Sequence, residues 1–317
     1  FTYNNGGGKR FKEEIRVRVL KELQKMKRDM TLCIGWIRKF KKSEEICLAA
    51  DSCFSGGQRF MAAPKVFSLP RKDCAIACAG DTTYSMPIVD HIVHSMEINK
   101  PLMDRAYDFL DIVHLVEDII NRCLYEEKEV QESDEEGPGF TMILAGYSLQ
   151  EKESRLFIIS YNKHLKKMKA NKAPTIMGTQ VAVIGDAELI QQTKRKLHLA
   201  FEKDGIKKGE SFGYQPLAVL QEYIDNPNIT TVGGHLQMLK VYPFAQVLPI
   251  GFYYPEEGSI FYYGRPLMKY ETFPYPIYDV KEKVFKYMKV NSKDFELVHE
   301  ETKKLTKFKV RRLVETK

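Results

Sequence analysis

The sequence predicts an α+β fold in which two stacked β-sheets carry helices on their outer faces, a four-layer αββα sandwich. Short apolar runs typical of strands alternate with helical patterns in the order strands, helix pair, strands, helix pair, strands. The strand-like runs are joined by short connections, which favours antiparallel pairing. With 317 residues, 44% of them apolar, the chain can bury a core large enough for such a sandwich.

The first group of strands is predicted at the start of this body. Residues 31–37 and 45–52 are apolar runs joined by the polar turn 38–44, a pattern typical of a hairpin. Residues 59–70 and 74–81 add two further strand-like runs. Four strands with short connections indicate one antiparallel sheet.

Two helices are predicted next, at about 83–98 and 104–125. In the second, apolar residues recur at helical spacing. They are Phe109, Leu110, Val113, Val116, Ile120 and Cys123. The acidic stretch that follows, 126–139, is expected to be an exposed loop.

A second group repeats this order. Strands are predicted at 140–148, 155–162 and 179–186, followed by helices at about 187–203 and 215–225. The repetition of strands followed by a helix pair is what suggests two sheets, each covered by its own helices.

The remaining strands, within 236–254 and 258–264, complete the predicted body. We therefore place the main domain at 30–272. A basic extension at 1–29, expected to be helical, precedes it, and a basic appendage at 273–317 follows it.

The net charge of +7 is concentrated in these flanks. Residues 1–29 hold nine Lys and Arg against four Asp and Glu, and residues 281–317 hold twelve against six, so the body between them is mildly acidic. Because only the flanks are basic, nucleic-acid binding is the weakest functional alternative. A protein partner contacted through the N-terminal helix or the C-terminal tail fits the pattern better.

The sequence also predicts the compartment. No apolar run approaches the roughly 20 residues needed to cross a bilayer, and the first residues lack a secretory signal. The six cysteines show no paired CxxC spacing, which indicates buried, reduced thiols. We expect a soluble, cytoplasmic protein that does not contact a membrane.

Four short segments follow one another in order near the start of the body. They are Thr31, AADS at 49–52, KVFSL at 65–69 and ACAGD at 77–81. In this order and spacing they resemble the proteasome β-subunit family and its bacterial relatives of the HslV and Anbu types. The resemblance covers roughly residues 30–265 and is densest in these four segments.

The resemblance implies an N-terminal-nucleophile hydrolase in which the hydroxyl of Thr31 attacks an amide carbonyl. A threonine hydroxyl is a weak nucleophile until a base takes its proton. In this family the base is the α-amine of the same threonine, whose ordinary pKa is about 7.7–8.0. Carried over by position, Lys65 stabilises the alkoxide and Asp51 pairs with Lys65.

The same resemblance implies supporting roles. The turn with Gly80 would donate a backbone N–H to the oxyanion, and a peptide would bind as an added strand beside Gly56 to Ala63. Two later segments fall where the family keeps further supporting residues, although Val232 stands where a serine is usual. The polar residues available in these segments are Asp186, Thr230 and Thr231.

The sequence thus predicts a threonine-type amide hydrolase, a peptidase whose copies form a homo-oligomeric ring and which needs no metal or organic cofactor. His91, His94 and Glu97 drift around a helix and are not expected to bind a metal. The mechanism requires a free α-amine, yet Met30 precedes Thr31. The alternative is a catalytically silent scaffold or zymogen subunit, capped by residues 1–30, that binds protein partners.

Overall fold

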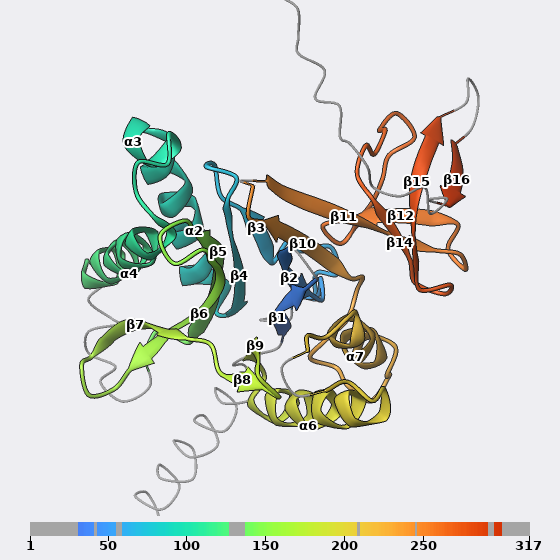
Figure 1. Cartoon of the computed structure of the whole chain (residues 1–317), viewed down its shortest axis with the longest axis horizontal. Coiled ribbons are helices and arrows are strands. Elements are labelled where there is room, and N and C mark those ends of the chain that lie inside the picture. The colour runs from blue at the N-terminus through green and yellow to red at the C-terminus, as the bar shows by residue number, and fades with distance from the viewer. Residues whose placement is uncertain are drawn as a thin grey trace, which may run out of the picture.

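The computed structural model of the protein describes residues 31–40, 43–54, 59–126, 137–207, 210–244, 246–290 and 295–299. The extension 1–29, expected to be helical, lies outside these ranges, as do most of the acidic stretch 126–139 and the tail after residue 299. Within them, the strands form an 11-stranded sheet and a 5-stranded sheet (Figure 1).

The centre of the larger sheet is made of β1 (Leu32–Lys39), β2 (Glu44–Ala50), β9 (Thr179–Gly185) and β10 (Gln237–Tyr242). β1 pairs antiparallel with both β2 and β9, and β10 pairs antiparallel with β2. β1 is buried on both faces, which explains its nearly continuous apolar sequence. The edge beyond β9 is the short β8 (Thr175–Ile176).

The smaller sheet is an antiparallel meander. Its strands, in spatial order, are β3 (Val66–Ser68), β4 (Cys74–Gly80), β5 (Phe140–Ser148), β6 (Glu153–Asn162) and β7 (Lys167–Lys172). Small residues let the two sheets approach closely. A Cβ on Gly35 would lie only 3.2 Å from Leu156 Cδ2 of the facing sheet, and seven alanines share the core between the sheets. They are Ala50, Ala75, Ala77, Ala79, Ala145, Ala173 and Ala182.

Two helices pack on the smaller sheet, and the four-residue α3 (Lys100–Met103) connects them. α2 (Thr82–Glu97) begins after Asp81, whose carboxylate accepts a hydrogen bond from Thr83 N. α4 (Phe109–Tyr125) begins with a capping box between Asp108 and Asp111. These caps are why the helices begin where they do.

The other two helices pack against the larger sheet beside β1 and β9. α6 (Ala187–Lys203) is capped by Asp186, and α7 (Gln215–Ile224) has a proline at its start. Their apolar residues share a core with Leu32, Ile34 and Trp36 of β1.

The larger sheet continues beyond β10. β11 (Gln246–Tyr254) pairs antiparallel with β10 and parallel with β14. The further strands are β12 (Ser259–Tyr262), β13 (Arg265–Pro266), β14 (Ile277–Asp279), β15 (Val284–Val290) and β16 (Phe295–His299). They extend to one side of the molecule, orange and red in Figure 1. A small core of Ile260, Phe273 and Ile277 stabilises part of this extension, and Tyr278 of β14 belongs to the large core shared with α6 and α7.

The predicted four-layer αββα sandwich is wrong. The described chain consists mainly of two antiparallel sheets with few helices, and strands β11 to β16 make the larger sheet much wider than the smaller one. The apolar runs within 236–254 and 258–264 correctly indicate strands, whereas β14, β15 and β16 lie in the stretch 273–317, for which no strand is predicted. The runs do not indicate that these strands extend one sheet outward, because partner choice depends on residues distant in the sequence.

Smaller differences have local causes. Most of the run 59–70, predicted as one strand, is irregular, and only Val66–Ser68 forms β3. The helix predicted from 104 begins at Phe109, because Asp108 caps it there. The strand run within 236–254 is interrupted by a turn between β10 and β11. Among the described residues, no helix is both long enough and apolar enough to span a membrane.

Candidate active site

Strand pairing brings the ends of three segments together at one edge of the core. Thr31 immediately precedes β1 and Asp51 immediately follows β2. Because the two strands are antiparallel, with Cys33 opposite Ala50, the start of β1 lies beside the end of β2. Lys65 immediately precedes β3 of the facing sheet. All three residues are therefore held by the ends of regular strands.

The three side chains form one hydrogen-bonded group. Thr31 Oγ1 donates to Asp51 Oδ1 at 2.9 Å, and Lys65 Nζ donates to the same Oδ1 at 2.7 Å. Lys65 Nζ also donates to Thr31 Oγ1. Thr31 is 4% exposed, Lys65 1% and Asp51 0%. In so dry a setting, the ammonium and the carboxylate interact far more strongly than they would in water.

Backbone donors complete the surroundings of Asp51. Leu32 N donates to Oδ1 at 3.1 Å, while Cys53 N and Gly233 N donate to Oδ2 at 3.0 and 3.1 Å. The buried carboxylate therefore accepts three backbone hydrogen bonds in addition to the Lys65 ion pair. A buried charge that is paired and hydrogen-bonded in this way is stable inside a protein.

This arrangement favours reaction at the Thr31 hydroxyl. The Lys65 ammonium is in contact with the oxygen that would become negatively charged on losing its proton, and Asp51 keeps that ammonium in place. The hydroxyl still needs a base to accept its proton. In the chain as given, the nitrogen of Thr31 is in a peptide bond to Met30.

The thiol of Cys33, which interacts electrostatically with Lys65 and Asp51, is unsuited to act as the nucleophile. Burial raises the pKa of Cys33 to about 12, with Lys65 lowering it and Asp51 raising it by smaller amounts. Cys33 Sγ donates to the carbonyl of Cys78 at 3.2 Å. Because a thiol attacks as its thiolate, Cys33 is inert at neutral pH.

Asp186 contacts Thr31 through the backbone and not through its carboxylate. Its N–H donates to the carbonyl of Thr31 at 3.1 Å. Its carboxylate accepts from Glu188 N and Leu189 N and so caps α6. The residue before it must be glycine, because Gly185 has φ +129° and a Cβ there would lie 1.9 Å from the Thr31 oxygen.

Neither Thr230 nor Thr231 provides the contact from its segment to the site. Thr230 is exposed and Thr231 is partly buried, whereas the hydrogen bond to Asp51 comes from the backbone N–H of Gly233. A backbone donor leaves no trace in residue type, so sequence reasoning missed it. The glycine pair after Val232 was the one available signal.

The three residues expected to lie beside the substrate or the oxyanion differ in their surroundings. Gly56 lies outside the described residues. Ala63 is buried, and its carbonyl accepts from Gln237 Nε2 at 2.9 Å. Gly80 ends β4 with φ +100°, directly before the capping residue of α2. This is the left-handed backbone for which glycine is best suited.

Ser52, the neighbour of Asp51, ties the segment of Gly233 to a second loop. Its Oγ donates to the carbonyl of Met61 at 2.6 Å and accepts from His235 N at 2.8 Å. Ser52 N donates to the carbonyl of Gly233 at 3.1 Å. The motif AADS thus supplies both a buried carboxylate and a hydroxyl that holds the surrounding loops.

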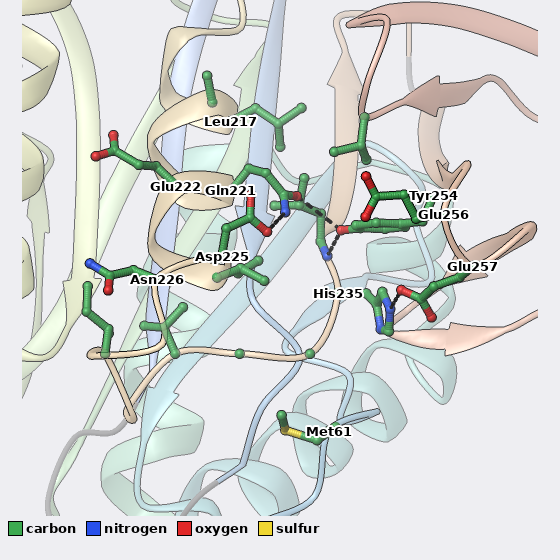
Figure 2. A pocket seen from close by; sticks show the side chains of 18 of the residues that line it. Met61, Leu217, Gln221, Glu222, Asp225, Asn226, His235, Tyr254, Glu256 and Glu257 are labelled. Atoms are coloured by element: carbon green, nitrogen blue, oxygen red, sulfur yellow. Dashed lines mark hydrogen bonds and ion pairs between the residues drawn. The ribbon is translucent and has the colours of Figure 1, made fainter.

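A pocket of about 1050 Å³ opens beside the segment of Gly233 (Figure 2). Its walls come from the end of α7, from the turn after β11 and from Met61. Tyr254 Oη donates to Gln221 Oε1 at 3.1 Å, and His235 pairs with Glu257 at 2.8 Å. Because Gly233 both lines this pocket and donates to Asp51, the pocket and the reactive group share one piece of backbone.

Among the described residues, no group of three or more His, Cys, Asp and Glu side chains is placed to hold a metal ion. His94 on α2 faces Asp90 one turn earlier, at 3.5 Å. His91, His94 and Glu97 therefore form no such group.

Comparison with known proteins does not assign this chain to a family. No protein-family model matches the chain, and no curated protein matches it either.

Proposed function

We propose that the protein is a threonine-type amide hydrolase that acts on peptides, with Thr31 as its nucleophile once the α-amine of Thr31 is free. The observation that carries the proposal is the buried contact of the Thr31 hydroxyl with both Lys65 and Asp51. The order of the motifs supports it, since they resemble those of proteasome β-subunits. Lys65 and Asp51 match the cation and the carboxylate that such a reaction uses, and the free α-amine of Thr31 would be its base.

In the proposed reaction, the free α-amine of Thr31 takes the hydroxyl proton as the oxygen attacks the amide carbon. The C–N bond then breaks, the amine product leaves with that proton, and the acyl group remains on Oγ1 as an ester. Water hydrolyses the ester and returns a proton to Oγ1. Lys65 stabilises the oxygen of Thr31 throughout, and Asp51 holds Lys65.

A backbone N–H in the turn of Gly80 is the proposed donor to the oxyanion. One donor of this kind is worth about 2.7–4 kcal/mol in other hydrolases. Assembly of several copies into a ring, which would restrict substrates to unfolded peptides, belongs to the same proposal and rests on the family resemblance.

The test compares two forms of the protein that differ only in what precedes Thr31. In one, ubiquitin is fused directly before Thr31 and removed by a deubiquitinase, which leaves a free Thr31. In the other, Met30 is retained. We expect hydrolysis of fluorogenic peptide amides only by the first form, and loss of that activity in Thr31→Ala.

Two results would overturn the proposal. One is equal hydrolysis by Thr31→Ala and by the form with a free Thr31. The other is no hydrolysis and no covalent labelling of Thr31 by peptide electrophiles in the processed form, with circular dichroism showing that it is folded.

The second candidate is a silent scaffold or zymogen subunit capped by residues 1–30. It is favoured by the peptide bond between Met30 and Thr31 and by the burial of Thr31. N-terminal sequencing of the protein purified from its own cells separates the two candidates. A chain that begins at Thr31 supports the enzyme, and a chain that begins upstream supports the scaffold or zymogen.

A further inference from the structure

The side chain of Gln237 is buried where the segments of Asp51 and Lys65 meet. Gln237 is the first residue of β10 and is 1% exposed. It lies opposite Ala50 of β2, so it is next to the strand end from which Asp51 emerges. Its position in the sequence, 172 residues after Lys65, places it outside any local motif.

All three hydrogen bonds of this amide go to backbone groups around the reactive cluster. Gln237 Oε1 accepts from Lys65 N at 2.9 Å. Gln237 Nε2 donates to the carbonyl of Asp51 and to the carbonyl of Ala63, both at 2.9 Å. One side chain therefore joins the backbone of the carboxylate residue to the backbone of the ammonium residue.

These bonds hold the backbone of Lys65 on the side of its N–H. On its other side, the carbonyl of Lys65 accepts from Cys78 N at 2.9 Å, which anchors it to β4. Lys65 precedes β3, so its N–H would have no partner without Gln237. Because an unpaired buried backbone group is costly, the amide determines where the lysine backbone lies.

We propose that Gln237 is a positioning residue of the site, which sets the distance between the Lys65 ammonium, the Asp51 carboxylate and the Thr31 hydroxyl. The proposal rests on the proposed hydrolase function. Only a side chain with both an acceptor and two donors at this length can make all three bonds. Glutamate lacks the donors, methionine lacks both kinds of group, and asparagine is one methylene shorter.

The chain offers a matched control in Asn121. Its amide also makes three hydrogen bonds to backbone groups. Oδ1 accepts from Met168 N, and Nδ2 donates to the carbonyls of Glu117 and Met168. It joins α4 to β7 and contacts none of the site residues. Asn121→Leu therefore measures the loss of stability when three such hydrogen bonds are removed away from the site.

The first experiment measures peptide hydrolysis by the form with a free Thr31. In Gln237→Met we expect kcat to fall about 10- to 100-fold with KM changed by less than about twofold, because misplaced reacting groups slow the reaction without weakening substrate binding. Asn121→Leu is expected to keep kcat. If Gln237→Met does not fold, kcat and KM are measured on the milder variant Gln237→Asn.

The second experiment does not depend on activity. In protein labelled with ¹⁵N at lysine Nζ, the Lys65 signal, assigned with Lys65→Arg, is expected to shift in Gln237→Met and to stay in place in Asn121→Leu. A shift without any hydrolysis by the parent chain would contradict the proposed function and support the positioning role. An unchanged Lys65 signal, or an equal loss of kcat in Asn121→Leu, would overturn the positioning role.

Discussion

The side chain of Lys65 is 1% exposed and lies against Asp51. Moving an ammonium from water into a protein interior costs several kcal/mol, and the cost is offset only by close pairing. Asp51 provides that pairing at 2.7 Å, and Thr31 accepts a further hydrogen bond. A buried pair of this kind adds little net stability, but loss of one partner leaves the other uncompensated.

We predict that Lys65→Met lowers the free energy of unfolding by about 3–5 kcal/mol, because it leaves the Asp51 carboxylate buried without a cation. Hydrolysis by the form with a free Thr31 should be lost. Urea unfolding and peptide assays on the same samples measure the two effects.

Lys240 is the matched control for this change. It is 7% exposed on β10 of the larger sheet, and its Nζ lies 3.3 Å from Glu45 near the far end of β2. Lys240→Met should also destabilise the protein, yet leave hydrolysis intact at temperatures where it is folded. Full hydrolysis by folded Lys65→Met would show that the ammonium has no part in the reaction.

At the scale of elements, the start of α4 depends on Asp108. Its carboxylate accepts from Leu110 N, Ser148 Oγ, Leu149 N and Gln150 N, and so ties the helix to the turn after β5. Burial by itself would raise the pKa of Asp108, but these hydrogen bonds outweigh it and leave the pKa below its ordinary value. The folded state therefore prefers the charged form.

This preference predicts a pH dependence. A carboxyl whose pKa is lowered on folding contributes stability above its unfolded pKa, about 3.9, and that contribution is lost as the pH falls through the lower, folded pKa. Asp108→Ala should cost about 1–2 kcal/mol at pH 7, and its difference from the parent chain should shrink below about pH 4. Urea unfolding at pH 7, 5 and 3 measures this.

Asp81→Ala serves as the comparison for that series. Asp81 caps α2 with a single exposed hydrogen bond to Thr83 N at 2.8 Å. Its removal should cost less at pH 7 than removal of Asp108. A constant Asp108→Ala difference from pH 7 to pH 3 would contradict the role given to the Asp108 charge.

At the scale of the whole molecule, burial is unevenly distributed. The strands between the helix pairs share three large apolar clusters. The extension contributes Phe252 and Tyr278 to one of these clusters, and its outer part has only the small cluster around Ile260, Phe273 and Ile277. Regions with fewer buried contacts open locally at lower free energy than the core. The extension is the part of the sheet where such opening is expected.

We therefore predict that backbone amides in 277–288 exchange with deuterium at least about tenfold faster than those in 32–37 and 45–50, a difference of about 1.4 kcal/mol in opening free energy. Mass spectrometry of peptic fragments measures both regions in one experiment. β10 provides an internal reference, since it lies in the same sheet as both. Equal protection across the sheet would show that it unfolds as one cooperative unit.

Part of the fold and of the candidate site follows from local sequence. The apolar runs of β1 and β2 and the helical spacing of Phe109, Val113 and Val116 are properties of short stretches, so they can be recognised without tertiary information. The ordered motifs also pointed to Thr31, Asp51 and Lys65, whose side chains the structure brings into contact.

Tertiary structure alone decided how these pieces combine. It joined β14 in parallel to β11, made the larger sheet much wider than the smaller one, and brought Gln237 and Gly233 to Asp51 across more than 180 residues. Periodicity reports which face of a strand is buried and not which strand lies beside it. A hydrogen bond to a distant backbone group leaves no pattern in the sequence around either partner, and so the support of this site became visible only in the folded chain.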